Sequence, residues 1–323
     1  MPHDRRSVLA SALGLAGAAM LPTLARAQQY PNAPIKFIIP TAVGGGYDLM
    51  MRMVGQKLQD AWGQPCVVDA RTGASGSIAA QLVARAAPDG YTLMIGYSAL
   101  VSNLALQPNP GYKLSDFAPV SMMTVSPVAL GVRESLGVKT LKEFVALAKS
   151  QPGKLSYGSY GPGSGGHFVG ELFKESAGVH MVHIPYRGEA PAIQDLLGGQ
   201  VDAVFITVGG VTRYPGKIRP LAICSPKAFP LYPDIPTFAQ AGFPDVNMPG
   251  FAGLFAPAAT PKPIVDKLSA EVNQIVKMPD VSQKILELGF EPVGWPADKV
   301  GPFLSEQMTL TQKLVASGRV KIS

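Results

Sequence analysis

The sequence predicts an α/β fold of two lobes, each built on a doubly wound, mostly parallel sheet, and three observations support this fold class. After about residue 28, short apolar runs alternate with helical stretches of ten or so residues, which is typical of parallel sheets with helices on both faces. The 323 residues exceed what one hydrophobic core comfortably supports. Glycine and proline fall between these elements, where they mark turns, and no internal repeat interrupts the pattern.

The elements follow in two series. In the first we expect strands at 35–39, 66–68 and 91–95, with helices at 48–60 and 78–86. In the second, Thr140 is a plausible helix N-cap. Its strands are expected at 128–132, 155–157, 181–184, 203–206 and 221–223, and its helices at 141–150, 168–177 and 190–197. Prolines at 226, 230, 233 and 236 predict an extended segment, followed by a strand at 251–255 and helices at 263–276, 281–288 and 302–316.

These series assign the chain to two lobes. Lobe I comprises residues 28–124 plus 243–323 and lobe II residues 125–242, with crossings near 121–127 and 225–245. Ligands of such sheets bind outside the carboxyl ends of the strands, so we expect the site in the cleft between the lobes.

The first 27 residues have the pattern of a signal peptide of the twin-arginine type. The adjacent Arg5 and Arg6 precede an apolar stretch from residue 8 to 21, and Ala25-Arg26-Ala27 offers a cleavage site after Ala27. A membrane helix is the alternative, but Pro22 and the Ala-x-Ala site argue against it. We therefore predict export to the periplasm, since no later segment has the roughly 20 apolar residues of a spanning helix.

Charge and cysteine content exclude several functions. The formal charge is +6, of which the predicted signal peptide contributes +2, and no run of Lys or Arg occurs, so nucleic acid is not an expected partner. The two cysteines, Cys66 and Cys224, have no spacing that indicates a disulfide framework or a metal site, although an oxidising compartment would permit a bridge between them.

Two glycine-rich loops, each joining a strand to a helix, are the candidate binding elements. One covers residues 40–48 with Gly44, Gly45 and Gly46, and the other covers residues 158–167 with Gly161 and Gly163. Glycine lets the backbone approach a ligand, and helix N-termini attract anions. Two facing loops could hold both ends of a dicarboxylate, although each loop could equally be a tight turn. Asp48 is expected to cap the first helix and so to fix the loop indirectly.

Catalytic signatures are missing. Gly161, Gly163 and Gly166 fit the dinucleotide pattern G-x-G-x-x-G, with Glu189 further on, but dense glycine makes a chance match and an exported protein rarely meets NAD. No nucleophile elbow or phosphate loop occurs. His180 and His183 fall on opposite faces of a strand, and a structural role is favoured for His167. We therefore expect no enzyme, no cofactor and no metal.

The sequence resembles the Bug-type receptors of tripartite tricarboxylate transporters. The resemblance runs from about Tyr30 to the carboxyl terminus and rests on many ordered motifs. They include residues 30–48, Arg71-Thr-Gly-Ala-Ser-Gly76, Asp89-Gly-Tyr-Thr-Leu93, Asp116-Phe-Ala-Pro-Val120, Pro152-Gly-Lys-Leu-Ser-Tyr-Gly-Ser159, His183-Ile-Pro-Tyr-Arg-Gly188, Gly198-Gly-Gln-Val-Asp202 and Pro233-Asp-Ile-Pro-Thr237.

The resemblance implies a monomeric periplasmic receptor of the Venus-flytrap type, without a cationic side chain for its ligand. It would capture a di- or tricarboxylate or an aromatic carboxylate and deliver it to the membrane permease subunits. An exported α/β enzyme or a ligand sensor is the alternative. The expected ligand-binding residues are Thr41, Ala42, Val43, Gly44, Gly45, Gly46, Asp48, Ser98, Ser159, Gly161, Gly163, Ser164 and Thr207.

Some positions depart from the family pattern. Thr41 stands where an aromatic residue is usual, Val43 where a small residue is common, and Tyr47 where Thr or Ser is common. Residues 207–215, which should line the rim of the cleft, match poorly, so the identity of the ligand is open.

Overall fold

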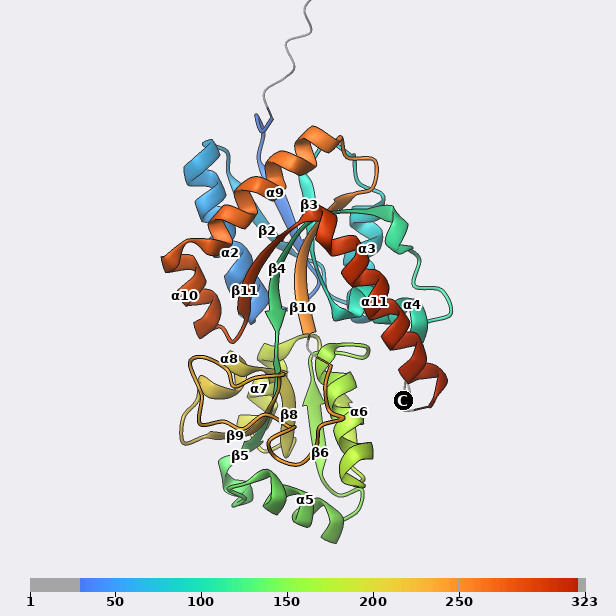
Figure 1. Ribbon diagram of the computed structural model, residues 1–323, viewed down its shortest axis with the longest axis vertical. Coiled ribbons are helices and arrows are strands. Elements are labelled where there is room, and N and C mark those ends of the chain that lie inside the picture. Colours follow the sequence, from blue (N-terminus) through green and yellow to red (C-terminus); the bar gives the residue numbers. More distant parts are fainter. Residues whose placement is uncertain (1–29, 249, 319–323) are drawn as a thin grey trace, which may run out of the picture. The chain divides into compact units, whose positions relative to one another are not determined.

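The computed structural model describes residues 30–248 and 250–318, and the chain from Ala33 onward forms one compact unit (Figure 1). The predicted signal peptide lies outside the described residues. Two separate β-sheets make up this unit, one of six strands and one of five. Each sheet, with the helices packed on it, is called a lobe below.

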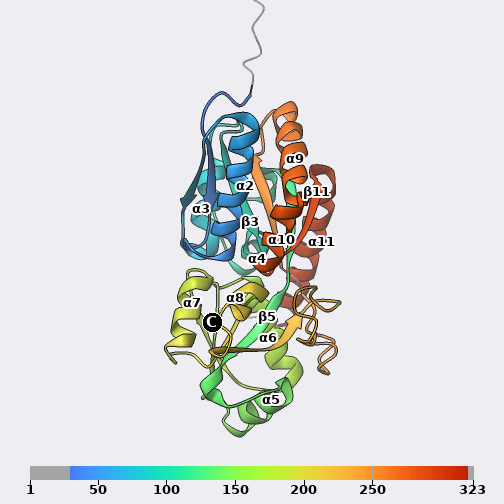
Figure 2. The ribbon, with the colours of Figure 1, turned by 90° about the vertical axis from the view of Figure 1, so that its left-hand side faces the viewer.

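The six-stranded sheet of lobe I has the order β11-β4-β10-β3-β1-β2. Its bounds are β1 (Ile35–Ile39), β2 (Cys66–Ala70), β3 (Thr92–Tyr97), β4 (Phe117–Ser126), β10 (Gly250–Pro257) and β11 (Glu291–Pro296). Helices α2 (Gly46–Trp62), α9 (Lys262–Lys277) and α10 (Pro279–Glu287) contact one another on one side of the sheet. Helices α3 (Ser77–Ala84), α4 (Ser98–Leu106) and α11 (Ala297–Ala316) lie on the other (Figures 1 and 2).

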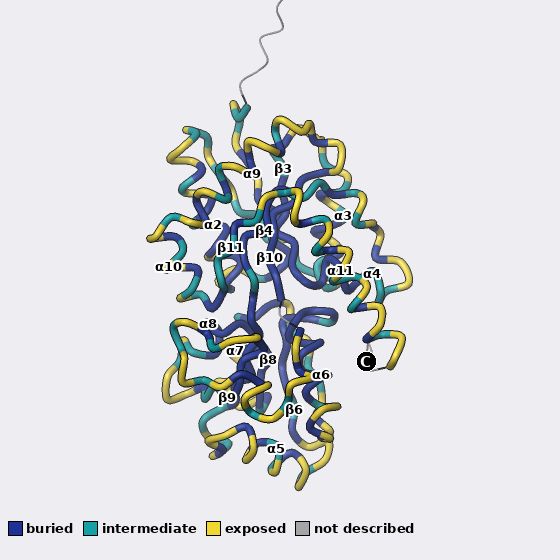
Figure 3. Tube along the Cα trace, in the orientation of Figure 1, coloured by how far each residue is buried: buried dark blue, intermediate teal, exposed yellow. Residues whose placement is uncertain are grey.

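The five-stranded sheet of lobe II has the order β7-β6-β8-β5-β9. It comprises β5 (Val128–Arg133), β6 (Ser156–Ser159), β7 (Val182–Pro185), β8 (Ala203–Thr207) and β9 (Ile218–Cys224). Its helices are α5 (Leu141–Ser150), α6 (Gly165–Ala177), α7 (Glu189–Leu197) and the short α8 (Val208–Thr212). Fully buried aromatic side chains fill its core, among them Tyr157, Phe168, Phe173, Phe205 and Phe238. The central strands β5, β6 and β8 are almost wholly buried (Figure 3).

The two-lobed α/β class is confirmed, but the sheets are mixed and not mostly parallel. Parallel pairing joins β1 to β2 and β3, and β6 to β7 and β8, whereas β10 and β5 each pair antiparallel with both of their neighbours. The connectivity explains the difference. The parallel strands point their carboxyl ends toward the other lobe, so a strand that enters a lobe from that side must run in the opposite direction.

The chain passes between the sheets at two points. The first is Pro127, between β4 and β5. Residues 225–246 stay with lobe II, because Phe238 and Val246 lie in its core and Phe238 N–H donates to Ile223 O at 3.0 Å. Met248 also packs in the lobe II core, and β10 of lobe I begins at Gly250, so the chain changes lobe later than the expected 225–245. In α11, Leu314 also packs against the lobe II core, so this helix contacts both lobes.

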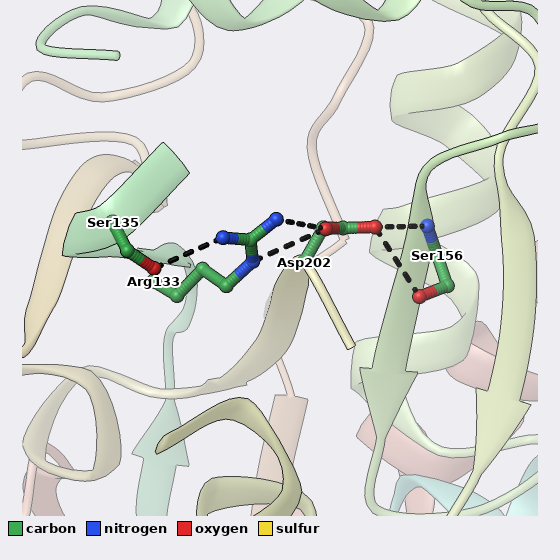
Figure 4. Close-up of polar contacts among 4 residues, drawn as sticks. All are labelled: Arg133, Ser135, Ser156 and Asp202. Carbon is green, nitrogen blue, oxygen red and sulfur yellow. Dashed lines mark hydrogen bonds and ion pairs between the residues drawn. The ribbon is translucent and has the colours of Figure 1, made fainter. Parts of the chain in front are cut away.

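One polar cluster ties three adjacent strands of lobe II together (Figure 4). Asp202, just before β8, pairs with Arg133 at the end of β5 through a 2.8 Å contact. The other oxygen of the same carboxylate accepts from the Ser156 N–H, at the start of β6, at 3.0 Å. A partly buried aspartate is thus fully engaged, which fixes the register of β5, β8 and β6 at this end of the sheet.

Candidate functional site

The two glycine-rich loops lie where parallel strands end, and each contacts the opposite lobe. The first loop joins β1 to α2, and its Ala42 N–H donates to the carbonyl oxygen of Arg187 in lobe II at 3.1 Å. The second loop joins β6 to α6, and its Gly163 carbonyl accepts from the Ser102 hydroxyl on α4 of lobe I. The predicted loops therefore meet the opposite lobe across the space that separates the two sheets.

A cavity of about 260 Å³ opens between the lobes beside these loops. Lobe I lines it with Pro40, Tyr97 and the turn 73–76, and lobe II lines it with residues 160–162 and 185–187. Within that turn Ala74 and Ser75 have positive φ values of 44° and 54°, a backbone conformation that non-glycine residues rarely adopt. Arg187 is the cation at this cavity, and no carboxylate of the described residues forms an ion pair with it.

The first loop divides into a buried base and an exposed tip. Thr41 is only 5% exposed and its Oγ1 has no hydrogen-bond partner among the described residues. Val43 is 59% exposed, and Gly44 is also exposed. Asp48 Oδ2 accepts from Gly44 N–H at 2.9 Å, and Asp48 Oδ1 is 3.0 Å from Arg52 Nη2, so this buried carboxylate is paired and holds the tip in shape.

Several amide groups that the sequence offers to a ligand are already bonded within the protein. Gly44 N–H donates to Asp48, Gly161 N–H to Ser159 Oγ at 3.3 Å, and Gly163 N–H to His167 Nδ1 at 3.1 Å. Ser164 is the N-cap of α6, and its hydroxyl accepts from His167 N–H at 3.3 Å. The N–H groups of these three glycines are therefore already engaged within their own loops.

The two histidines of lobe II support the second loop. The rings of His167 and His183 stack with centroids 4.3 Å apart, and His183 Nε2 lies 2.7 Å from Ser159 Oγ. Burial, with the charges of His167 and Lys174 adding to it, lowers the pKa of His183 from 6.5 to about 3. His183 is thus neutral near pH 7, as a group that positions Ser159 by hydrogen bonding.

Thr207 and Gly46 flank a buried carboxylate that belongs to Glu189. Thr207 is the N-cap of α8, and its N–H donates to Glu189 Oε1 at 2.7 Å. The Thr207 hydroxyl donates to Glu189 Oε2 at 2.9 Å. A Cβ added to Gly46, the first residue of α2, would lie 3.9 Å from Glu189 Oε2. Burial raises the pKa of Glu189 above its usual range, and the hydrogen bonds from Thr207 oppose that rise.

An aromatic group lies between this carboxylate and the cavity. The ring of Tyr47 stacks on those of Phe290 and Tyr97, with ring centroids 5.1 Å and 5.5 Å apart. The ring centroids of Tyr97 and Tyr160 of lobe II are 6.0 Å apart. All three tyrosines are at most 4% exposed. Burial raises the pKa of each, and the charge of Glu189 adds to the rise for Tyr47 and Tyr160. These phenols therefore stay protonated at neutral pH.

Ser98, another of the predicted binding residues, begins α4 directly after β3 and is 7% exposed. Its hydroxyl would lie 3.5 Å from a Cβ on Gly250, where the chain re-enters lobe I. Ser98 thus lies close to the second passage between the lobes.

Comparison with known proteins identifies the family. The model described as "Tripartite tricarboxylate transporter family receptor" matches residues 50–318. The chain belongs to this family. The periplasmic binding protein BugD superposes with a TM-score of 0.85 at 30% identity, over 91% of this chain and all of that one. A Rhodopseudomonas palustris protein solved with adipate gives 0.86 at 32% identity, over 89% and 97% of the two chains. MatC from the same organism, solved with malate, gives 0.83 at 31% identity, over 88% and 100%.

Family membership confirms the predicted Bug-type resemblance and the role of a periplasmic solute-binding receptor. Members of this family are receptors and not enzymes. No helix among the described residues is long and apolar enough to cross a membrane.

Sequence reasoning missed the third connection that reaches the site, residues 186–189 between β7 and α7. It supplies Arg187 to the cavity and Glu189 to the buried pair with Thr207. The signal was present, because β7 is a parallel strand and its carboxyl end must lie at the same edge as that of β6. Tyr160 and Ser75, which also line the cavity, lie in the predicted loop 158–167 and in a family motif.

Proposed function

We propose that this receptor captures a small organic carboxylate in the cavity between its lobes and delivers it to the permease of a tripartite tricarboxylate transporter. The observation that carries the proposal is the 260 Å³ cavity, whose walls come from strand ends of both lobes. Its volume lies just below the roughly 300–1,000 Å³ of sites for drug-sized ligands, so it suits a ligand with few heavy atoms. Two relatives of the same fold were solved with adipate and with malate.

Arg187 is the group that we expect to hold one ligand carboxylate. Its charge is not neutralised by an ion pair within the described residues, and it lies at the cavity. A guanidinium presents several N–H donors in a plane that matches a carboxylate. The unpartnered Thr41 hydroxyl, near the base of the first loop, is a second candidate contact. The expectation of a receptor without a ligand-binding cation is therefore replaced by an arginine from a loop outside the two that the sequence singled out.

Capture requires the lobes to move apart and close again. The described contacts between Ala42 and Arg187 and between Ser102 and Gly163 belong to a closed arrangement, which these bonds favour. We propose hinge motion where the chain passes between the lobes, at Pro127 and ahead of β10. The protein would work as a monomer in the periplasm after removal of residues 1–27. It would bind the permease subunits at the periplasmic side of the membrane.

Isothermal titration calorimetry with the untagged receptor tests the proposal, beginning with adipate and malate and continuing through tricarboxylates and aromatic acids. A binder is also stabilised against heat by about RT ln(1 + [L]/Kd). Arg187→Gln should weaken binding of a hit about tenfold, since a hydrogen bond to a charged group contributes about 1.5–3 kcal/mol. Arg85→Gln, an exposed arginine on the edge of α3, is the matched control.

Two outcomes count against the proposal. Failure of every carboxylate to bind would remove the ligand class. Conversion of a bound carboxylate into a product would favour an exported enzyme instead, and product analysis of the titrated samples by mass spectrometry detects it.

A further inference from the structure

The cavity between the lobes is charged at one place only. Among the described residues that line it, Arg187 of lobe II is the one charged side chain. The other lining residues are glycine, alanine, proline, serine and tyrosine. Burial raises the pKa of Tyr97, Tyr160 and Tyr186, so these phenols stay protonated at neutral pH. A carboxylate that enters the cavity therefore finds a counter-charge at Arg187 and at no other lining residue.

The end of the cavity that belongs to lobe I is backed by apolar residues. A smaller cavity of about 10 Å³ lies beside it, because Pro40, Ser75, Gly76 and Tyr97 line both. Holding one water molecule takes roughly 10–15 Å³ and several polar partners. The remaining walls of the smaller cavity supply no polar side chain, since they come from the lobe I core: Ala80, Met94, Ile95, Gly96 and Leu100. This end suits a methyl group or the edge of a ring better than an ion.

The turn 73–76, which supplies the backbone polar groups of this end, uses several of them within lobe I. Gly76 N–H donates to Gly73 O at 2.9 Å, and Ser75 O accepts from Asn103 Nδ2 at 3.0 Å. Asn103 Nδ2 also donates to Ser77 Oγ at 3.2 Å, where α3 begins. These bonds hold the turn against its own lobe, so the groups that make them are not available to a second carboxylate.

We propose that the receptor selects monocarboxylates, with Arg187 binding the carboxylate and the lobe I end, at Ser75 and Tyr97, accepting an uncharged aliphatic or aromatic body. This inference rests on the proposed function and narrows its ligand class. A second carboxylate would leave water for an end of the closed site that has no counter-charge, and burial of an unpaired charge is strongly unfavourable. An apolar body has no charge to desolvate and gains from the burial of its own surface.

Matched pairs of ligands test this selectivity by isothermal titration calorimetry of the intact receptor. The members of a pair have the same number of carbon atoms and differ in the second carboxylate: pentanoate with glutarate, hexanoate with adipate, and 4-methylbenzoate with terephthalate. At about pH 8 both carboxyl groups of each diacid are ionised. We expect each monocarboxylate to bind the wild type at least about tenfold more tightly than its dicarboxylate partner.

A cation added at the lobe I end should remove or reverse this preference. Ser75→Lys places an ammonium group at a residue that lines both cavities, so the dicarboxylates should gain at least about tenfold relative to the monocarboxylates. Ser150→Lys is the matched control, because Ser150 is an exposed serine at the end of α5, outside the site. It should keep the wild-type preference. The wild-type ligand series stands by itself if Ser75→Lys fails to fold.

Two results would overturn the selectivity. One is a dicarboxylate, malate included, that binds the wild type at least as tightly as the monocarboxylates do. The other is a folded Ser75→Lys receptor with an unchanged preference, which would put the far end of the ligand away from this turn. Both would leave the carboxylate receptor in place, whereas failure of every mono-, di- and tricarboxylate to bind the wild type would reject the proposed function itself.

Discussion

His183 should make the stability of the receptor depend on pH in a way that one substitution removes. Its imidazole stacks between the rings of Tyr157 and His167 and contacts the Ser159 hydroxyl. Burial, with the charges of His167 and Lys174, lowers its pKa from 6.5 to about 3 in the folded protein. The folded state therefore stays neutral at His183 where the unfolded state already binds a proton. Between those two pKa values the unfolded chain binds more protons, so stability rises with pH.

The magnitude follows from the two pKa values. The contribution is fully present above pH 6.5 and is lost progressively as pH falls toward 3. From about pH 7 to about pH 5 the loss assigned to His183 is about 2 kcal/mol. Any folded pKa below about 4 gives nearly the same figure, because the folded imidazole is then neutral throughout this interval.

Urea denaturation of wild type and His183→Gln at a series of pH values measures this difference. The substitution lowers overall stability, but its pH dependence should be shallower than that of the wild type by about 2 kcal/mol over the same interval. Burial raises the pKa of Glu189, so its contribution changes in the opposite direction, and it cancels because both proteins contain it. His180→Gln, at an exposed histidine, should keep the wild-type dependence. Parallel curves for wild type and His183→Gln would refute the assignment of a neutral, buried His183.

Two further predictions concern the second loop and a helix cap. Gly163→Ala should cost at least about 1–2 kcal/mol because Gly163 has a φ of 71°, and its new Cβ would also meet Ser102 Oγ at 2.8 Å. The free energy of unfolding of Gly45→Ala should stay within about 0.5 kcal/mol of the wild type, since Gly45 has a φ of −79° and the atom nearest to the new Cβ is 3.6 Å away. Urea midpoints compare the two variants, and equal losses of stability would contradict the loop geometry. Thr140→Ala should cost about 1 kcal/mol, because the Thr140 hydroxyl accepts from Glu143 N–H at the start of α5, whereas Thr140→Ser should retain most of that stability.

Strands and helices with strong periodicity could be predicted from the sequence, and those with prolines or glycines could not. β1 and α5 begin and end at the predicted residues because a β-branched run and a capped amphipathic stretch define them locally. β11 was missed because it contains Pro292, Gly294 and Pro296, which its place at the edge of the sheet tolerates. α8 was missed because its residues are Val-Gly-Gly-Val-Thr, and it forms where Thr207 caps its first turn. β4 was not predicted as a strand. It pairs with β10 and β11, which lie far from it in the sequence, so no local pattern indicates it.

The candidate site divides in the same way. The positions of the two glycine loops follow from the strand-to-helix alternation, which is a local pattern. Which atoms the loops leave free depends on side chains that approach from elsewhere. The Gly163 N–H donates to His167, four residues later. The Thr207 N–H donates to Glu189, 18 residues earlier in the chain, because α7 packs against β8.

Because some loop N–H groups already donate to protein side chains, we expect side chains to contribute more than these N–H groups to ligand binding. A helix N-terminus binds an anion through its free N–H groups together with its dipole. In this receptor Asp48 occupies Gly44 N–H at the start of α2, and His167 occupies Gly163 N–H ahead of α6. The Asp48 carboxylate, which pairs with Arg52, also lies close to the positive end of α2. Under the proposed function, an incoming carboxylate gains more from Arg187, a full positive charge at the cavity, than from these loop N–H groups.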